Sequence, residues 1–188
     1  MKKGLIVGGI IIGIVLILVM MFSSTYNSLV SKEEEVEGKL ADISVQLERR
    51  ADLIPNLVST VKGYMSHEQS VIDSVTEARQ NLMSADDVED QAEANQELTN
   101  ALNNLFVVVE NYPDLKANTN FIQLQDELAG TENRIAVARK DYNEAVKDYN
   151  KTIKSFPKNI LASMFDFEEK EYFEAKEISN EVPEVSFE

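Results

Sequence analysis

The sequence predicts an all-α protein: an N-terminal transmembrane helix, then an elongated antiparallel up-and-down bundle of three long helices and a short fourth. An uncharged apolar run near the N-terminus predicts the transmembrane helix. Apolar residues at alternating spacings of four and three predict the bundle, because an average near 3.5 is typical of helices that pack along their length. The chain has only seven Gly and four Pro, and no useful length of strand alternation.

Leu5–Phe22 is the apolar run, with eighteen consecutive uncharged residues, of which thirteen are Leu, Ile, Val or Phe. At about 1.5 Å per residue, a helix of this length extends roughly 27 Å, close to the thickness of a bilayer core. Insertion is favoured by on the order of 4–8 kcal/mol before the glycines are discounted. A cleaved signal peptide is the alternative, but its apolar region is usually about 7–15 residues long, and no A-x-A-like site follows here. We therefore expect an uncleaved signal-anchor that contacts the lipid bilayer.

Lys2 and Lys3 precede the apolar run and orient it. Positive charge favours the cytoplasmic side, so we expect residues 1–4 in the cytoplasm, a single pass through the cell membrane, and an extracytoplasmic C-terminal domain. Two G-x-x-x-G patterns begin at Gly4 and Gly9, and this spacing lets two membrane helices approach closely. The spacing therefore allows a homo-oligomer that forms through the membrane helices.

The first soluble helix reaches Met83 if it is unbroken. Pro55 predicts a kink or a break, because proline removes one backbone hydrogen bond and clashes with the preceding turn. Ser84-Ala85-Asp86-Asp87 indicates a stop and a capping box for the next helix. The apolar seam of the first helix consists of Val36, Leu40, Ile43, Leu47, Ile54, Leu57, Val61, Tyr64, Val71, Val75, Ala78 and Leu82.

The second helix ends at Tyr112-Pro113, because the residue before proline avoids the helical region, and 113–117 is a turn. The third helix starts near 118–120 and runs to about Ser155, where Phe156-Pro157 ends it. A short last helix around Leu161 folds back. The second seam consists of Leu98, Leu102, Leu105, Val109 and Tyr112, and the third of Phe121, Leu124, Leu128, Thr131, Ile135, Ala138, Tyr142, Ala145, Tyr149, Thr152 and Phe156.

These signals place the helical bundle at residues 26–165 and an acidic, disordered tail at 166–188. The chain carries a formal net charge of −15, and the tail contributes nine acids and two lysines, or −7 (2 − 9). Nucleic acid is excluded as a partner, because its binding needs a basic footprint. There is no cysteine, which fits either side of the membrane.

Several motifs resemble those of the LemA family, and together they cover the anchor and nearly all of residues 26–165. The resemblance implies a single-pass prokaryotic membrane protein with a helical-bundle domain and no established biochemical activity. This chain has Leu40 where family members often carry Trp. The difference affects only a packing position. The matching motifs are Tyr26-Asn27-x-Leu29-Val30, Arg49-Arg50-x-Asp52-Leu53-Ile54-Pro55-Asn56-Leu57-Val58, Tyr112-Pro113-Asp114-Leu115-Lys116-Ala117-Asn118, and the run from Asn120-Phe121 through Gly130-Thr131-Glu132-Asn133-Arg134-Ile135 to Ala138-Arg139.

Charged residues on or beside the seams form the candidate site. Arg50 takes a seam position between two apolar residues, and a buried charge needs a partner, for which Glu127 or Glu132 is expected. One interpretation is an interhelical polar network that fixes the register of the helices. The other is a recognition or ligand site between helices. The candidate set is Arg50, Asp52, Glu127, Glu132, Arg134 and Arg139.

No motif predicts catalysis, a metal or a cofactor. The sequence has no G-x-S-x-G, phosphate loop, EF-hand loop or H-E-x-x-H, and Tyr64 before His67 breaks the E-x-x-H of di-iron bundles. We therefore expect a non-enzymatic scaffold or adaptor for unknown membrane or envelope proteins. A membrane-anchored enzyme with acidic residues in an interhelical groove is the alternative, and a self-associating structural lattice is a third hypothesis.

Overall fold

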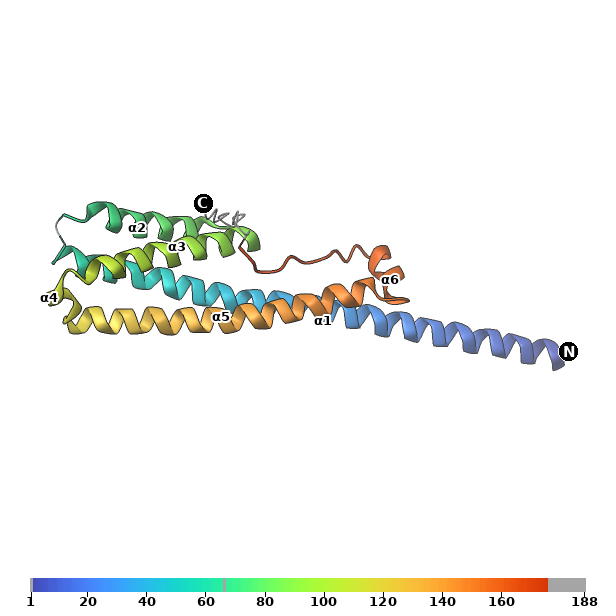
Figure 1. Cartoon of the computed structure of the whole chain (residues 1–188). Coiled ribbons are helices and arrows are strands. Elements are labelled where there is room, and N and C mark those ends of the chain that lie inside the picture. Colours follow the sequence, from blue (N-terminus) through green and yellow to red (C-terminus); the bar gives the residue numbers. More distant parts are fainter. Residues whose placement is uncertain (1, 66, 176–188) are drawn as a thin grey trace, which may run out of the picture. The chain divides into compact units, whose positions relative to one another are not determined.

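A computed structural model describes residues 2–65 and 67–175, with side chains from Gly8 onward. The described residues form helices and no strand (Figure 1). The all-α prediction is confirmed, because a long N-terminal apolar helix is followed by a helical bundle. The helices are α1 (Lys2–Lys62), α2 (Gln69–Ser84), α3 (Val88–Val109), α4 (Pro113–Lys116), α5 (Thr119–Lys154) and α6 (Lys158–Met164).

The chain divides into two compact units, and α1 and α5 each contribute to both. The first unit contains the residues up to Ile43 and Ala138–Glu171, and the second contains Ser44–Val137 and the segment that begins at Tyr172. The buried apolar side chains of the first unit are Leu29, Val36, Ile43, Tyr142, Val146, Tyr149, Ile153, Leu161 and Ala162. Those of the second include Leu47, Ala51, Ile54, Leu57, Val61, Val75, Leu82, Leu98, Leu102, Leu105, Val109, Phe121, Leu128 and Ile135.

Pro55 lies inside α1, and of the predicted kink or break the break is wrong, because the helix continues to Lys62. Proline has no amide hydrogen, so it cannot donate to the carbonyl of Ala51 one turn earlier. The Nε of Arg79 on α2 donates to that carbonyl at 2.8 Å. A side chain from a neighbouring helix therefore supplies the hydrogen bond that proline removes from α1.

The first helix ends instead at Lys62, and α2 is a separate helix. Gly63 follows, and the amides of Tyr64 and Met65 both donate to the carbonyl of Val61. This turn shifts the apolar register by one residue. The predicted seam residue Tyr64 is exposed and Met65 is buried in its place.

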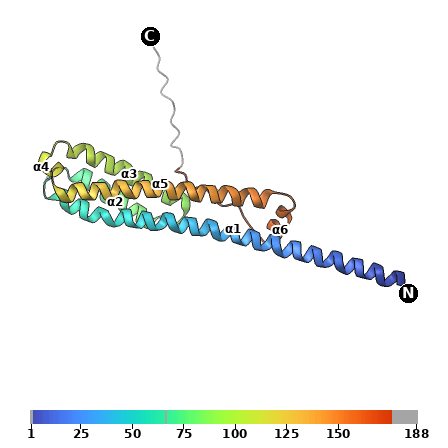
Figure 2. The same ribbon diagram turned by 90° about the horizontal axis from the view of Figure 1, so that it is seen from below.

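The helix ends after residue 84 follow local rules. The Asp87 carboxylate accepts the amide of Asp90 at 2.7 Å and caps α3, which lies beside α2 in the second unit (Figures 1 and 2). The predicted turn after Pro113 is a four-residue helix, α4, because proline at a first helical position fits the helical backbone. The predicted seam residue Phe156 is exposed, because α5 ends at Lys154.

The first part of the predicted tail packs against α5 within the first unit. The Asn150 amide nitrogen donates to the carbonyl of Lys170 at 2.8 Å, and its oxygen accepts the amide of the same residue at 3.0 Å. The Nζ of Lys170 lies 2.8 Å from a carboxylate oxygen of Glu33 on α1. The segment that ends at Glu171 thus joins α1 and α5, whereas residues 176–188 of the predicted tail lie outside the described residues.

Two buried tyrosines of the first unit lead to a paired prediction. Tyr142 donates from its hydroxyl to the carbonyl of Glu171 at 2.8 Å, whereas no described residue forms a hydrogen bond with the Tyr149 hydroxyl. At neutral pH, Tyr142→Phe should lower the free energy of unfolding by about 0.5–1.5 kcal/mol. Tyr149→Phe should leave it unchanged or slightly raised. Chemical unfolding of the full-length protein in detergent, followed by circular dichroism, measures both.

The second of these tyrosines, Tyr149, predicts that the stability of the fold depends on pH. Burial, with smaller contributions from the charges of Glu33 and Glu168, raises the pKa of Tyr149 from about 10 to about 12. The folded state thus favours the neutral hydroxyl, so this contribution to stability is complete below about pH 10 and is lost as the pH rises through about 12. Tyr149→Phe should flatten the fall in unfolding free energy between these pH values. An equally steep fall in the variant would contradict the assignment.

Candidate functional site

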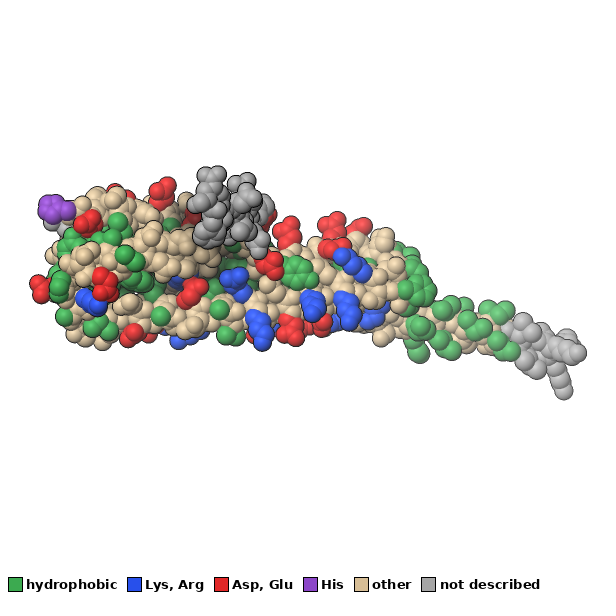
Figure 3. Space-filling view, in the orientation of Figure 1, with side chains coloured by type: hydrophobic (Ala, Val, Ile, Leu, Met, Phe, Trp, Pro, Cys, Tyr) green, Lys and Arg blue, Asp and Glu red, His purple; other side chains and the backbone are tan. Residues whose placement is uncertain are grey.

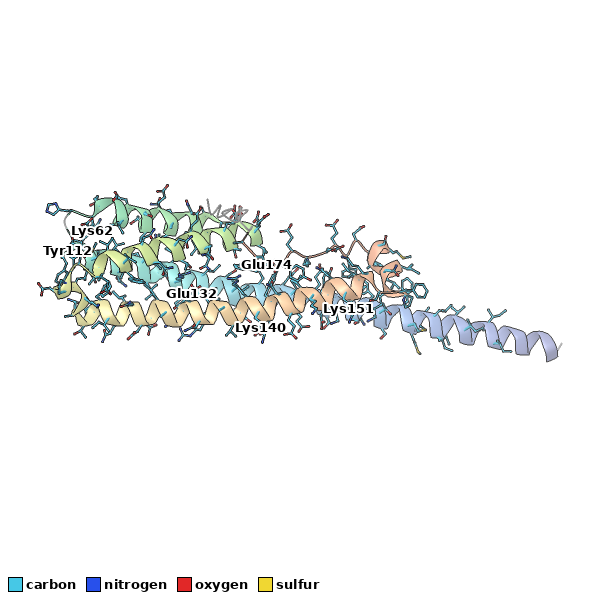
Figure 4. All side chains as sticks on the ribbon, viewed as in Figure 1. Lys62, Tyr112, Glu132, Lys140, Lys151 and Glu174 are labelled. Atoms are coloured by element: carbon cyan, nitrogen blue, oxygen red, sulfur yellow. The ribbon has the colours of Figure 1, made fainter. Side chains whose placement is uncertain are left out.

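The charged residue predicted on the α1 seam lies at the centre of a polar cluster in the second unit. Arg50 is only 3% exposed, and its Nη1 lies 2.6 Å from a carboxylate oxygen of Glu132 on α5. The same nitrogen donates to the side-chain oxygen of Asn95 on α3, which is also buried. We call Arg50, Asn95 and Glu132 the Arg50 cluster, and Figure 4 labels Glu132 on its helix. The cluster joins three helices by one guanidinium group.

Burial and charge act in opposite directions on this arginine. Burial lowers the pKa of Arg50, and the negative charge of Glu132 opposes that shift. The carboxylate itself is about two-fifths exposed (39% of its side chain), so water reaches one end of the pair. A guanidinium group that is desolvated but paired is stable as a cation, and this one contacts α3 and α5 from its place on α1.

The other predicted residues lie apart from this cluster. Glu127 forms an exposed ion pair with Arg49, at 2.9 Å between Nη2 and the carboxylate. Asp52 and Arg134 are exposed, and Arg139 is half-buried in the first unit. Of the six candidates, the structure thus brings together Arg50 and Glu132. Sequence reasoning missed Asn95, although it lies three residues before Leu98 and so continues the second seam toward the start of the helix. Extending the seam by one position would have found it.

Two grooves of the second unit are open to solvent and lined by polar side chains. One of about 440 Å³ lies between α1 and α5, and among its lining residues only Glu127 carries a carboxylate. Another of about 250 Å³ lies between α2 and α3, and its carboxylates are Asp90, Glu93 and Glu97, of which the first and last are exposed. Within the described ranges, no group of His, Asp and Glu side chains could hold a metal ion. These grooves can bind polar groups, but they do not enclose a substrate away from water.

The beginning of α1 has the opposite character. From Ile10 to Phe22 its large apolar side chains are all exposed, and Figure 3 shows hydrophobic side chains all along this part of the helix, up to the grey residues at its end. In the described part of the chain, one helix is long and apolar enough to cross a membrane, and it is α1. Its next turns carry Leu29, Val36 and Ile43, which are buried. The apolar side chains of α1 are therefore exposed all round the helix at its beginning, and farther along only one face of the helix is packed.

Fold and site together define a helical-bundle protein whose first helix begins with an exposed apolar segment of membrane-spanning length. Residues 39–187 match the LemA family, and the chain belongs to that family. The resemblance in the sequence motifs is thus confirmed. The match begins after the apolar run, and it extends through most of the acidic tail, which the motifs did not cover.

Curated relatives agree with this membership. The chain is 28% identical over 177 residues to the magnetosome proteins MamQ 1 and MamQ 2 of Paramagnetospirillum magneticum, a match that covers 80% of this chain and 65% of each relative. It is 24% identical over 153 residues to the protein LemA of Metamycoplasma hominis, with 81% of this chain and 70% of the relative covered. The chain thus spans about two-thirds of the length of the MamQ relatives (65%), and neither name is that of an enzyme.

Proposed function

We propose that this protein is a membrane-anchored, non-enzymatic scaffold or adaptor that presents its helical bundle to other envelope proteins outside the cytoplasm. The observation that carries the proposal is the construction of α1. Its exposed apolar beginning is suited to lipid, and the same helix continues into the packed core of the first unit. Anchor and bundle are therefore parts of one element, with no separate linker between them.

The polar chemistry of the bundle supports a non-enzymatic function. The buried cation of the Arg50 cluster already contacts Asn95 and Glu132 through its Nη1, and its Nε is buried, so the guanidinium group is not presented to a substrate in solvent. The grooves are open to solvent, where an acid–base pair would lose the advantage of a water-excluded site. These features favour a protein that acts by binding other proteins through the surfaces of its helices.

The anchor is tested on membranes that contain the full-length protein. We expect the protein to remain in the membrane pellet after carbonate extraction at high pH, because about 27 Å of apolar helix lies in the bilayer core. The matched control is the double substitution Val15→Arg and Leu18→Arg, which should insert less well, since each central arginine costs about 2.5–3.5 kcal/mol. Release of the intact wild-type protein into the soluble fraction would contradict the anchor.

The orientation is tested separately. Protease added to cells with a permeable outer layer should digest the bundle, because Lys2 and Lys3 hold the N-terminus in the cytoplasm. Digestion only after lysis would place the bundle in the cytoplasm.

The scaffold function is tested by crosslinking in the native membrane. Photoreactive groups at exposed positions of α2 and α3, such as Met83 and Val107, should attach the full-length protein to discrete envelope proteins. The charge-bearing variant of the anchor should lose these products. Products that contain only this chain would favour the self-associating lattice, and the absence of any discrete product would oppose a scaffold.

A further inference from the structure

We propose that α6 and its flanking residues form a second membrane contact, an apolar patch that lies in the lipid headgroup region beside the point where α1 leaves the bilayer. The patch consists of Phe156, Ile160, Met164 and Phe165, and we call it the α6 patch. All of these residues belong to the first unit, which also contains the apolar beginning of α1. The inference rests on the proposed anchor and extends it from one contact with the membrane to two.

Aromatic contacts connect this patch to the end of the apolar run. The rings of Phe165 and Phe22 are 6.3 Å apart, and those of Phe165 and Tyr26 are 4.9 Å apart, both in edge-to-face geometry. Phe167 lies 5.9 Å from the same tyrosine. Phe22 is the last residue of the apolar run, and Tyr26 is about one helical turn beyond it. Both views of the ribbon show α6 beside α1 (Figures 1 and 2).

The exposure of α6 is one-sided. Leu161 and Ala162 are buried, whereas Ile160 and Met164 are 53% and 60% exposed. Phe156, just before the helix, is 82% exposed. Large apolar side chains gathered on one surface are unusual for a protein face in water and indicate a binding surface. Because the patch adjoins the helix that enters the bilayer, lipid is the partner that its position favours.

The backbone holds this arrangement in place. Asp166, directly after the patch, has a φ of 56°, in the left-handed region where Asp is one of the few tolerated non-glycine residues. The amide of Phe167 donates to the carbonyl of Ala162 at 3.0 Å across this turn, a closure typical of helix C-termini. The turn reverses the chain, so that Phe165 and Phe167 both contact Tyr26.

Charge around the patch fits the headgroup region. Residues 149–165 contain no acid and include three lysines, Lys151, Lys154 and Lys158, and the acids begin at Asp166. Lys154 pairs with Glu169 at 2.6 Å, which leaves Lys151 and Lys158 as the lysines proposed to contact lipid phosphates. Lysines that flank an interfacial apolar helix reach lipid phosphates while their stems remain on the apolar surface. A tyrosine beside the end of a span, here Tyr26, is likewise typical of the membrane–water interface, and phenylalanine is common on the apolar face of interfacial helices.

The chain has no cysteine, so single substitutions give one labelling site each. Full-length Ile160→Cys and Met164→Cys, each carrying an environment-sensitive fluorophore, are reconstituted in phosphatidylcholine vesicles. Val137→Cys on α5 is the matched control, because the exposed fraction of Val137 (61%) is similar to those of the two test residues. Val15→Cys reports on the anchor itself. Lipids that carry a quencher near the headgroup or deep in the acyl chain measure depth.

We expect the labels at 160 and 164 to show blue-shifted emission and quenching by the shallow lipid quencher, whereas the label at 137 stays sensitive only to an aqueous quencher. If Val15→Cys is quenched by the deep lipid quencher but 160 and 164 behave like 137, the α6 patch is refuted and the anchor stands. If Val15→Cys is not quenched by lipid either, the proposed anchor fails as well. Shielding at 160 and 164 that disappears on dilution of the protein in lipid, without lipid quenching, would show a second copy on the patch and overturn the inference.

Discussion

Arg50→Ala should lower the free energy of unfolding by about 3–5 kcal/mol. The guanidinium group is 3% exposed and is the shared partner of Asn95 and Glu132. Its removal leaves a buried amide and a partly buried carboxylate without their donor, and an unpaired buried polar group costs more than the bond itself was worth. Chemical unfolding in detergent, followed by circular dichroism, measures the change.

Arg49→Ala provides the matched control. Arg49 is the next residue, is about half exposed, and pairs with an exposed carboxylate of Glu127 at 2.9 Å. An exposed ion pair contributes about 0–1 kcal/mol, so this substitution should change stability little. Equal losses in Arg49→Ala and Arg50→Ala would show that the Arg50 cluster is not a desolvated pair.

Apolar replacement of the whole cluster separates its two interpretations. Arg50→Met with Glu132→Leu should recover much of the loss of Arg50→Ala, and the further substitution Asn95→Leu should recover more, because no buried polar group is then left unpaired. If the triple variant folds and still gives the crosslinked products of the wild type, the cluster is a structural device that fixes register. If it folds but loses those products, the cluster contributes to recognition.

Leu128→Ala should cost about 2–5 kcal/mol, because Leu128 is 3% exposed on the packed face of α5 and its truncation leaves a cavity. Val137→Ala on the same helix is the control. Val137 is largely exposed, and substitutions at such positions usually change stability by less than about 0.5 kcal/mol. A loss under about 0.5 kcal/mol for Leu128→Ala would show that the seam of α5 is not a packed core.

The sequence predicts features that repeat, and the structure of α5 shows why. Phe121, Leu128, Ile135 and Tyr142 follow each other at intervals of seven, and all four are buried. Arg50 stands out against such a pattern, because a charge at an apolar position requires an explanation. A periodic signal thus reveals both the packed face and the exception on it.

Features that depend on one residue were harder to predict. Asn95 continues the second seam three residues before Leu98, but it is polar and is followed by the exposed Gln96 and Glu97, so the apolar pattern starts only at Leu98. The Asn150 side chain donates to the carbonyl of Lys170 and accepts the amide of the same residue. Lys170 lies in a run of acids that the sequence predicts as part of the tail. In both residues a single amide side chain decides the structure, and only the tertiary arrangement shows which backbone or side chain it faces.

The contact between Arg79 and the carbonyl of Ala51 has a consequence for how this sequence can vary. The two residues are 28 positions apart, and the contact is needed only because residue 55 is a proline. A lineage that replaces Pro55 with an ordinary helix former regains the internal bond of α1, and position 79 is then released from its constraint. A lineage that keeps the proline must keep a donor at position 79 or leave a carbonyl unsatisfied within the helix. Substitutions at 55 and 79 should therefore be correlated among related sequences, although the hydrogen bond joins Arg79 to the backbone of Ala51 and residue 55 takes no part in it.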